Sequence, residues 1–296
     1  SIVGETTEDD ASWTSAVRSA LQKVAHATGM KPYPYLVEVA WVSTALVALL
    51  ARLLAATPVL VNGALVVVVL AAFVVYSWLV HINPLFILLH FYEVLCEPHY
   101  IDRSLRHSLL LFWLLNFTAS VLFVVIVSHQ GQSNSIHRKF FHLTLSLVFI
   151  SGAVVDRPFL GLCSALLLSI FIVAELFRHY NVPPWMPGLD RHLGVFRDHQ
   201  DGEWLLTPLY LLAGVTLPLL LAWLFPPSSS PPAPSSAPPL ALFAGVVAVG
   251  VGDAAAAAVG TLAGRHHWPG RHKTVEGTTG MCMSMVAALL LLRPLS

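Results

Sequence analysis

The chain has 296 residues, of which 56% are hydrophobic and only 11% charged, and its mean hydropathy is +0.72. A soluble domain carries roughly 25% charged residues, so this composition excludes an ordinary soluble protein and indicates an integral membrane protein. The 16 basic residues balance the 16 acidic ones, so no net positive field favours a nucleic-acid partner. The three cysteines form no C-x-x-C pair and support neither a disulfide framework nor a zinc site.

Eight apolar runs recur along the chain, and we interpret them as spans of a hydrocarbon core that is roughly 30 Å thick. They cover residues 36–56, 59–80, 105–128, 140–155, 158–177, 205–225, 239–263 and 280–292. Lipid cannot satisfy an open backbone, and the runs lack the alternation of a membrane barrel, so the spans are predicted to be helices. The predicted fold is all-α, a polytopic transmembrane helix bundle with about eight spans. A further apolar piece at 84–96 is too short to assign, and a re-entrant segment and half of a broken span both stay open.

Polar segments mark the predicted boundaries. Residues 1–35 form a polar N-terminal tail that could include a surface helix, and residues 36–134 hold the N-terminal transmembrane helices. The region 135–296 carries the candidate chemistry and includes a flexible Pro/Ser-rich linker at 226–239. The sequence opens on Ser1 without an n-region and an apolar h-region, so we expect no signal peptide and a fragment of a longer chain.

The distribution of cations predicts the orientation in the membrane. A hairpin that turns at Asp156 and Arg157 places the segments 129–139, 178–204 and 264–279 on one side. That side holds eight cations and the other side only Arg157. The eight are Arg138, Lys139, Arg178, Arg191, Arg197, Arg265, Arg271 and Lys273. Since cytoplasmic loops are enriched in Lys and Arg, the first side is predicted to be cytosolic.

Asp253 is the one charged residue in the run 244–264. A carboxylate near the bilayer centre costs roughly 2.5–3.5 kcal/mol on insertion scales, so Asp253 is predicted to face a cavity, a metal or a cation. Gly252, Ala256 and Gly260 repeat at every fourth position and leave a stripe without large side chains. Helix packing explains such a stripe by itself, whereas an intramembrane acid is usually functional.

The stretch GRHHWPGRHKTVEG, residues 264–277, is the least membrane-like part of the second half of the chain. Arg265, Arg271 and Lys273 supply fixed positive charge that can grip phosphate. The Pro-Gly pair at 269–270 predicts a turn that folds the two halves of the loop together. The three histidines lack acidic or cysteine partners at ligand spacing and do not favour a metal site.

Two interpretations of the end of this loop stay open. Glu276 follows Lys273 by three residues, so in a helical turn one could bind phosphate and the other Mg²⁺, as phosphoryl transfer requires. Alternatively, the cations only fix the topology, while Thr274 caps the last helix and Glu276 complements its dipole.

Two more polar segments are expected on the same membrane face. In HRKFFHL, residues 137–143, Arg138 and His142 lie one helical turn apart with Lys139 beside them. Phosphate contact and simple snorkelling of the basic side chains are both open. In FRDHQDGEW, residues 196–204, the clustered acids could bind a metal, although a solvated loop is the commoner explanation. These acids are Asp198, Asp201 and Glu203.

The stretch VGVGDAAAAAVGTLAGRHHWPGRHKTVEGT, residues 249–278, resembles the nucleotide-binding segment of the dolichol kinase family. That segment combines GVGD, a helix of small residues, WPG and a KT-x-EG run. RKFFHL, DRP, the region 175–178 and YLLAGVTLP are similar to family motifs in the same order, and the likeness covers roughly 135–290. The family continues through further spans, so we expect a partial chain. A more distant likeness extends to phosphatidate cytidylyltransferases and to phytol and farnesol kinases.

The resemblance implies an enzyme that transfers the terminal phosphate of CTP to the hydroxyl of dolichol. The product, dolichyl phosphate, would serve protein glycosylation. The expected location is the endoplasmic reticulum membrane, with a CTP loop at 261–276 facing the cytosol and a kinase-like membrane catalytic region at 135–296. The expected partners are CTP, dolichol or another polyprenol and membrane lipid, without nucleic acid, and the expected cofactor is a divalent cation, Mg²⁺.

The resemblance and the spacing of the polar residues together suggest roles for individual residues. Asp253, Lys273 and Glu276 are the expected catalytic residues, with Asp253 and Glu276 holding Mg²⁺ and Asp253 the candidate proton acceptor. The expected accessory residues are Arg138, Lys139, His142, Asp198 and Asp201. The expected CTP-binding residues are Gly252, Thr261, Gly264, Arg265, His266, His267, Trp268, Pro269, Gly270, Arg271, His272, Thr274 and Gly277.

Alternative functions remain at this stage. Within enzymes, they are nucleotidyl transfer of the phosphatidate cytidylyltransferase type and a phytol or farnesol kinase; WPG and RKFFH favour the dolichol kinase interpretation. From another class, the chain could be a transporter or an inactive membrane scaffold. Transport would be favoured by inverted repeats, which the two halves of the sequence do not show.

Overall fold

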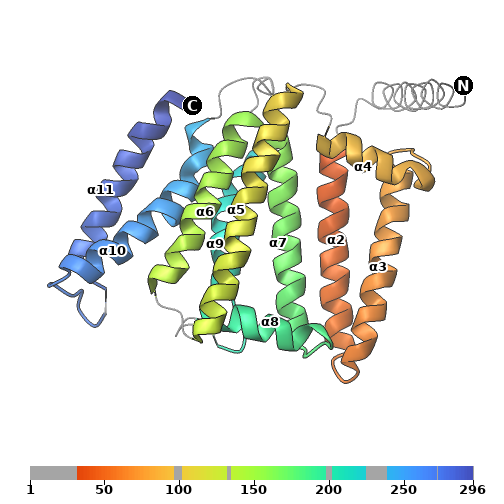
Figure 1. Cartoon of the computed structure of the whole chain (residues 1–296), viewed down its shortest axis with the longest axis horizontal. Coiled ribbons are helices and arrows are strands. Elements are labelled where there is room, and N and C mark those ends of the chain that lie inside the picture. The colour runs from red at the N-terminus through yellow and green to blue at the C-terminus, as the bar shows by residue number, and fades with distance from the viewer. Residues whose placement is uncertain are drawn as a thin grey trace, which may run out of the picture.

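The computed structural model describes residues 32–96, 102–131, 135–197, 202–224, 239–271 and 273–295. Within these ranges the regular structure is helical, apart from one isolated bridge in a loop. Among the described residues, seven helices are long and apolar enough to cross a membrane, and the apolar helix Thr207–Ala222 is shorter. The predicted all-α polytopic bundle of about eight spans is therefore confirmed, and Figure 1 shows its long helices side by side.

The elements follow one another along the chain with short connections. The first half contains α2 (Pro32–Leu53), α3 (Pro58–Leu79), η1 (Pro84–Phe86), α4 (Ile87–Cys96) and α5 (Arg103–Gln130). The second half contains α6 (Ser135–Val155), α7 (Arg157–His179), α8 (Trp185–Leu193), η2 (Gly194–Phe196), α9 (Thr207–Leu224), η3 (Leu240–Phe243), η4 (Val246–Gly252), α10 (Asp253–Ala263), α11 (Val275–Leu292) and η5 (Arg293–Leu295).

Local sequence explains where several helices begin and end. α5 begins after Asp102, whose side chain accepts a hydrogen bond from the first turn, and ends at Gly131, whose φ of +73° favours glycine. The turn predicted at Asp156 and Arg157 is present, because Asp156 separates α6 from α7. Asp156 also caps α7 by accepting a hydrogen bond from the Phe159 N–H at 3.0 Å. The expected hairpin of α6 and α7 is confirmed.

A buried ion pair holds this turn against two other helices. Arg106 of α5 pairs with the Asp156 carboxylate, and both side chains are fully buried. The Arg106 guanidinium lies 4.0 Å from the centroid of the Phe159 ring and donates a hydrogen bond to the Tyr33 hydroxyl at 3.4 Å. Because a buried charge is costly without its partners, this cluster ties α2, α5 and α7 together.

α4 answers the question raised by the short apolar piece at 84–96. Its 10 residues rise by about 15 Å, half the thickness of the hydrocarbon core, so α4 cannot cross by itself. In Figure 1 it lies across the ends of α2 and α3, while α8 lies across the opposite end of the bundle. The Tyr76 hydroxyl and His90 Nε2 lie 3.0 Å apart. Burial lowers the pKa of His90, so the neutral ring can accept this hydrogen bond.

The core that positions the candidate site lies between α6, α9 and η4. Its buried residues include Phe149 of α6, Val215 of α9 and Val247 of η4. Gly245 brings the backbone ahead of η4 against α9, because a Cβ added there would lie 2.4 Å from the Gly214 carbonyl oxygen. Only a residue without a side chain permits this approach, so the start of η4 is fixed against α9.

Several predicted features lie outside the described residues. They are the polar tail through residue 31, most of the Pro/Ser-rich linker, Asp198, Asp201 and His272. The division of the chain into domains stays a prediction.

Candidate functional site

η4 leads directly into Asp253, the first residue of α10. It is a π-helix, a rare conformation that occurs frequently at functional sites. Gly250 of η4 packs against Ser146 of α6, where an added Cβ would lie 3.3 Å from the Ser146 Cβ. This close packing places the first turn of α10 beside α6.

Two basic side chains of α6 contact Asp253. Lys139 Nζ forms an ion pair with Asp253 Oδ2, and His142 Nε2 lies 2.9 Å from the same oxygen. His142 is buried, and its Nδ1 lies 3.0 Å from the Arg138 carbonyl oxygen. Asp253 itself stays half exposed. The intramembrane acid therefore faces two basic groups and keeps an accessible side, which is the arrangement of a polar centre that a ligand can reach.

α10 and α11 form an antiparallel hairpin whose connection is the polar loop at 264–274. The loop closes like a β-hairpin: the Trp268 N–H donates to the Lys273 carbonyl at 2.9 Å, and the Val275 N–H donates to the His266 carbonyl at 2.8 Å. The predicted turn at 269–270 is confirmed. Pro269 and Gly270 are its central residues, and Gly270 has a φ of +67° that suits a type II turn.

Small residues allow the two helices to meet at the base of the loop. A Cβ on Gly264 would lie 2.7 Å from the Thr274 Cγ2, and one on Gly277 would lie 2.9 Å from the Ala256 carbonyl oxygen. Thr274 is buried between them, and its hydroxyl accepts a hydrogen bond from the Gly277 N–H at 3.1 Å as the cap of α11. Packing of α10 on α11 thus accounts for the stripe of small residues. Gly252 lies on the same face of the helix, where an added Cβ would lie 3.0 Å from the Met285 side chain.

The loop presents its polar side chains outward. Its exposed residues are Arg265, His266, His267, Trp268, Pro269, Gly270, Arg271 and Lys273. The three cations among them lie on one short hairpin, as a site for an anionic ligand requires. Thr261 is exposed at the end of α10, with its hydroxyl donating to the Ala257 carbonyl at 2.7 Å.

The first turn of α11 holds the loop through side chains. Both oxygens of Glu276 lie 3.2 Å from the His266 backbone nitrogen, and Oε1 lies 2.6 Å from His266 Nδ1. The Trp268 indole N–H donates to the Thr278 hydroxyl at 3.0 Å.

The two carboxylates expected to share a metal ion are separated along the hairpin. Asp253 is the first residue of α10, whereas Glu276 lies in the first turn of α11, beside the end of α10. Gly260, which packs on Gly277, is seven residues beyond Asp253, a rise of about 10 Å along the helix. Asp253 contacts α6, whereas Glu276 contacts the loop. Among the described residues, no group of three or more His, Cys, Asp and Glu side chains could hold a metal. A single ion held by both carboxylates does not fit this geometry.

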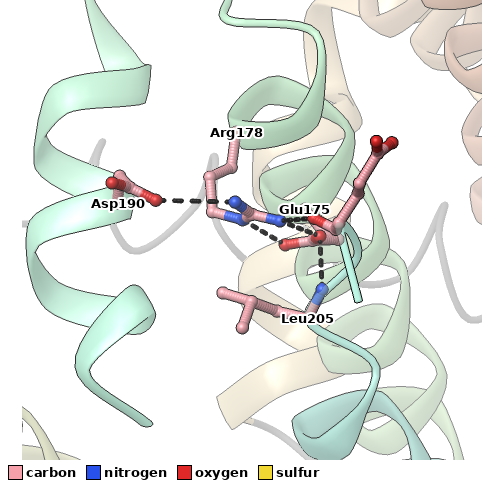
Figure 2. Close-up of polar contacts among 5 residues, drawn as sticks. Glu175, Arg178, Asp190 and Leu205 are labelled. Carbon is pink, nitrogen blue, oxygen red and sulfur yellow. Dashed lines mark hydrogen bonds and ion pairs between the residues drawn. The ribbon is translucent and has the colours of Figure 1, made fainter. Parts of the chain in front are cut away.

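A second polar network, whose contacts were not predicted from the sequence, lies at the end of α7 (Figure 2). Glu175 and Arg178 are both buried, with Arg178 Nε and Nη2 donating to the Glu175 carboxylate at 2.8 and 2.6 Å. Arg178 also donates to the Glu203 carbonyl at 2.6 Å, and the Leu205 N–H donates to Glu175 at 2.7 Å. Nη1 lies 3.5 Å from Asp190 of α8. Opposite charges three residues apart within an apolar run were the available signal.

This network fixes the chain ahead of α9. It grips the backbone on both sides of Trp204, whose ring stacks on the His179 ring with centroids 3.7 Å apart. The segment that follows the predicted acidic cluster is therefore held in place through the backbone of Glu203 and Leu205.

Comparison with known proteins finds relatives in sequence that are all named dolichol kinases. The chain is 34% identical to the human dolichol kinase over 237 residues, which is 76% of this chain and 42% of that protein. It is 31% identical to dolichol kinase EVAN of Arabidopsis thaliana, over 64% of this chain and 32% of that protein. It is 27% identical to the dolichol kinase of Saccharomyces cerevisiae, over 65% of this chain and 34% of that protein.

The chain spans about two fifths of the length of the human relative. No family model matches the chain, and no solved structure matches it. The matches come from animals, a plant and yeasts, and each covers well over half of this chain. Over as much as three quarters of its length, the chain is thus related in sequence to the dolichol kinases.

Proposed function

We propose that this chain carries the catalytic region of a CTP-dependent dolichol kinase. The observation that carries the proposal is Asp253, a half-exposed carboxylate at the start of a membrane helix, between Lys139 and His142 and on the same hairpin as an exposed basic loop. The sequence relationship to dolichol kinases supplies the acceptor, a polyprenol alcohol.

The arrangement suits phosphoryl transfer, in which positioning and charge neutralisation supply most of the acceleration. The alcohol oxygen bonds to the γ-phosphorus of CTP while the bond from that phosphorus to the bridging oxygen breaks, and CDP leaves. The hydroxyl proton passes to Asp253, the nearest carboxylate to the two basic side chains of α6. Arg265, Arg271 and Lys273 hold the phosphates from the loop.

A nucleotide donor commonly brings a divalent cation bound to its phosphates, and Mg²⁺ needs few protein ligands when phosphates and water complete its shell. Asp253 can serve as one such ligand, and the described residues offer no larger protein-built site.

The proposed location is the endoplasmic reticulum membrane, with the loop in the cytosol. The endoplasmic reticulum is inferred from the family resemblance, and the cytosolic side is supported by the excess of cations on that side and by the fold. The beginning of α6, the end of α7 and the loop between α10 and α11 lie toward the same end of the bundle in Figure 1. This is the end at which a water-soluble nucleotide can meet a lipid alcohol.

The test is transfer of radiolabel by the purified chain in lipid vesicles, with dolichol, farnesol, phytol and phosphatidate as acceptors. We expect label from γ-labelled CTP to enter dolichol, label from α-labelled CTP to stay in the aqueous phase, and ATP to be a poorer donor. Label from α-labelled CTP in phosphatidate would instead indicate nucleotidyl transfer. A folded chain that binds CTP but labels no acceptor would contradict the proposal.

A further inference from the structure

We propose that Glu276 is a positioning residue that braces the loop at 264–274 through His266, and that it does not bind the metal ion or the reacting atoms. The inference rests on the proposed function, because the loop is taken as the nucleotide site. It differs from the metal-binding role that the sequence pattern suggests for Glu276, and the experiment below separates the two.

The contacts of Glu276 point to a brace. Its two carboxylate oxygens both face the backbone N–H of His266, and one of them also meets the ring Nδ1 at 2.6 Å. The Glu276 side chain is 26% exposed, whereas the His266 ring is 80% exposed. The ring lies on the outside of the contact, so the carboxylate is turned toward its own loop.

A second side-chain contact joins the loop to α11, two residues further along both segments. The Trp268 indole N–H donates to the Thr278 hydroxyl, which itself donates to the Thr274 carbonyl at 3.1 Å. Thus residues 266 and 268 of the loop are joined to residues 276 and 278 of α11. Together with the backbone bonds across the hairpin, these contacts hold the loop against the first turn of the helix.

Bracing matters because the exposed cations are on the braced segment. Arg265 precedes His266, and Arg271 and Lys273 lie on the returning arm of the same hairpin. A loop that is already ordered loses less conformational entropy when it binds an anion, so bracing raises affinity without adding a contact to the ligand. Loss of a charge-assisted hydrogen bond at a partly exposed site predicts a rise of roughly tenfold in the KM for CTP.

The position of Glu276 relative to the polar centre agrees with this role. Asp253 contacts Lys139 and His142 on α6, about 10 Å of helix rise away from the level at which α11 begins. The Glu276 carboxylate is turned toward His266 at the far end of α10, so it does not reach the metal ion or the reacting atoms beside Asp253.

The kinetic test compares Glu276→Gln with Glu276→Ala in the vesicle assay. The amide oxygen of Gln still accepts from the His266 N–H, so we expect Glu276→Gln to raise the KM for CTP only a few-fold and Glu276→Ala to raise it roughly tenfold. His266→Ala removes the ring contact but keeps the backbone N–H, so it should raise the KM for CTP only a few-fold, and it should add nothing further to Glu276→Ala. The Mg²⁺ concentration for half-maximal rate should stay the same throughout.

A metal-binding Glu276 predicts the opposite pattern. Glu276→Gln would then lower kcat by a hundredfold or more and would move the Mg²⁺ requirement upward, while His266→Ala would have little effect. A large loss of kcat or a higher Mg²⁺ requirement in Glu276→Gln would overturn the brace, and so would an unchanged KM for CTP in His266→Ala.

A second measurement needs no enzymatic activity. Arg265, Arg271 and Lys273 are exposed trypsin sites, so the rate of cleavage in the loop reports how firmly it is held. We expect Glu276→Ala and Thr278→Val to be cut several-fold faster than the parent chain at these sites, identified by peptide mass.

Thr279→Val is the matched control for Thr278→Val. The Thr279 hydroxyl is exposed and donates to the Val275 carbonyl of its own helix, so this variant should be cut at the parental rate. Equal cleavage of all variants would refute the brace even in an active kinase. Faster cleavage of the braced variants in a chain without CTP-dependent transfer would leave the brace standing and refute the proposed function.

Discussion

Gly245→Ala tests whether the contact between α9 and the start of η4 positions the catalytic carboxylate. At Gly245 an added Cβ would lie 2.4 Å from the Gly214 carbonyl oxygen and 2.7 Å from the Val215 Cα. Both are backbone atoms of α9, so the collision cannot be relieved by turning a side chain. The two segments must move apart.

The structure gives the size of the displacement and its consequence. Ordinary contacts of a Cβ begin near 3.4 Å, so the 2.4 Å approach requires a shift of about 1 Å. Overpacking of this kind costs about 1–3 kcal/mol of stability. Asp253 follows Gly245 by eight residues through η4, and a misplacement of about 1 Å can lower a reaction rate by about a hundredfold.

Gly214→Ala is the control on the same interface. There the added Cβ would lie 3.0 Å from Val249 Cγ2, a side-chain atom that can turn away. The assay measures kcat for transfer from CTP to dolichol per folded molecule, together with the midpoint of thermal unfolding. We expect kcat to fall about a hundredfold in Gly245→Ala and less than threefold in Gly214→Ala. Equal values of kcat in the two variants would refute the idea that this contact positions Asp253.

Three further predictions concern the proposed reaction centre, the polar network of α7 and the base of the loop. Asp253→Asn and Lys139→Met should each lower kcat by at least a hundredfold in the same assay while a thermal melt shows an intact fold, since both remove charge from the proposed reaction centre; near-parental rates in both would show that the centre is assigned wrongly. Arg178→Gln should destabilise the chain by about 3–5 kcal/mol in denaturant unfolding because it leaves Glu175 buried without its partner, and a double replacement of Arg178 and Glu175 by Met should recover part of that loss. Gly264→Ala should raise the KM for CTP and speed tryptic cleavage of the loop, because its Cβ would collide with the buried Thr274 side chain that caps α11; a loop that behaves as in the parent chain would contradict the packing described at its base.

The sequence by itself determined the helical elements and the features that depend on neighbouring residues. Hydropathy over about 20 residues predicts a membrane helix, because the lipid forces each segment to satisfy its own backbone. Two local features were also predictable, because their hydrogen bonds join residues only three positions apart. They are the turn at Pro269 and Gly270 and the cap at Thr274. The cost of an intramembrane acid also marked Asp253 in advance.

Only the tertiary structure decided which groups meet. Lys139 and Asp253 are 114 positions apart, and they touch because Gly245 and Gly250 let η4 pack closely between α9 and α6. The sequence places Glu276 three residues after Lys273 but does not show that the Glu276 carboxylate turns to His266. Such pairings depend on the tilt and rotation of each helix, which are set by packing between distant segments and leave no periodic signal in the sequence.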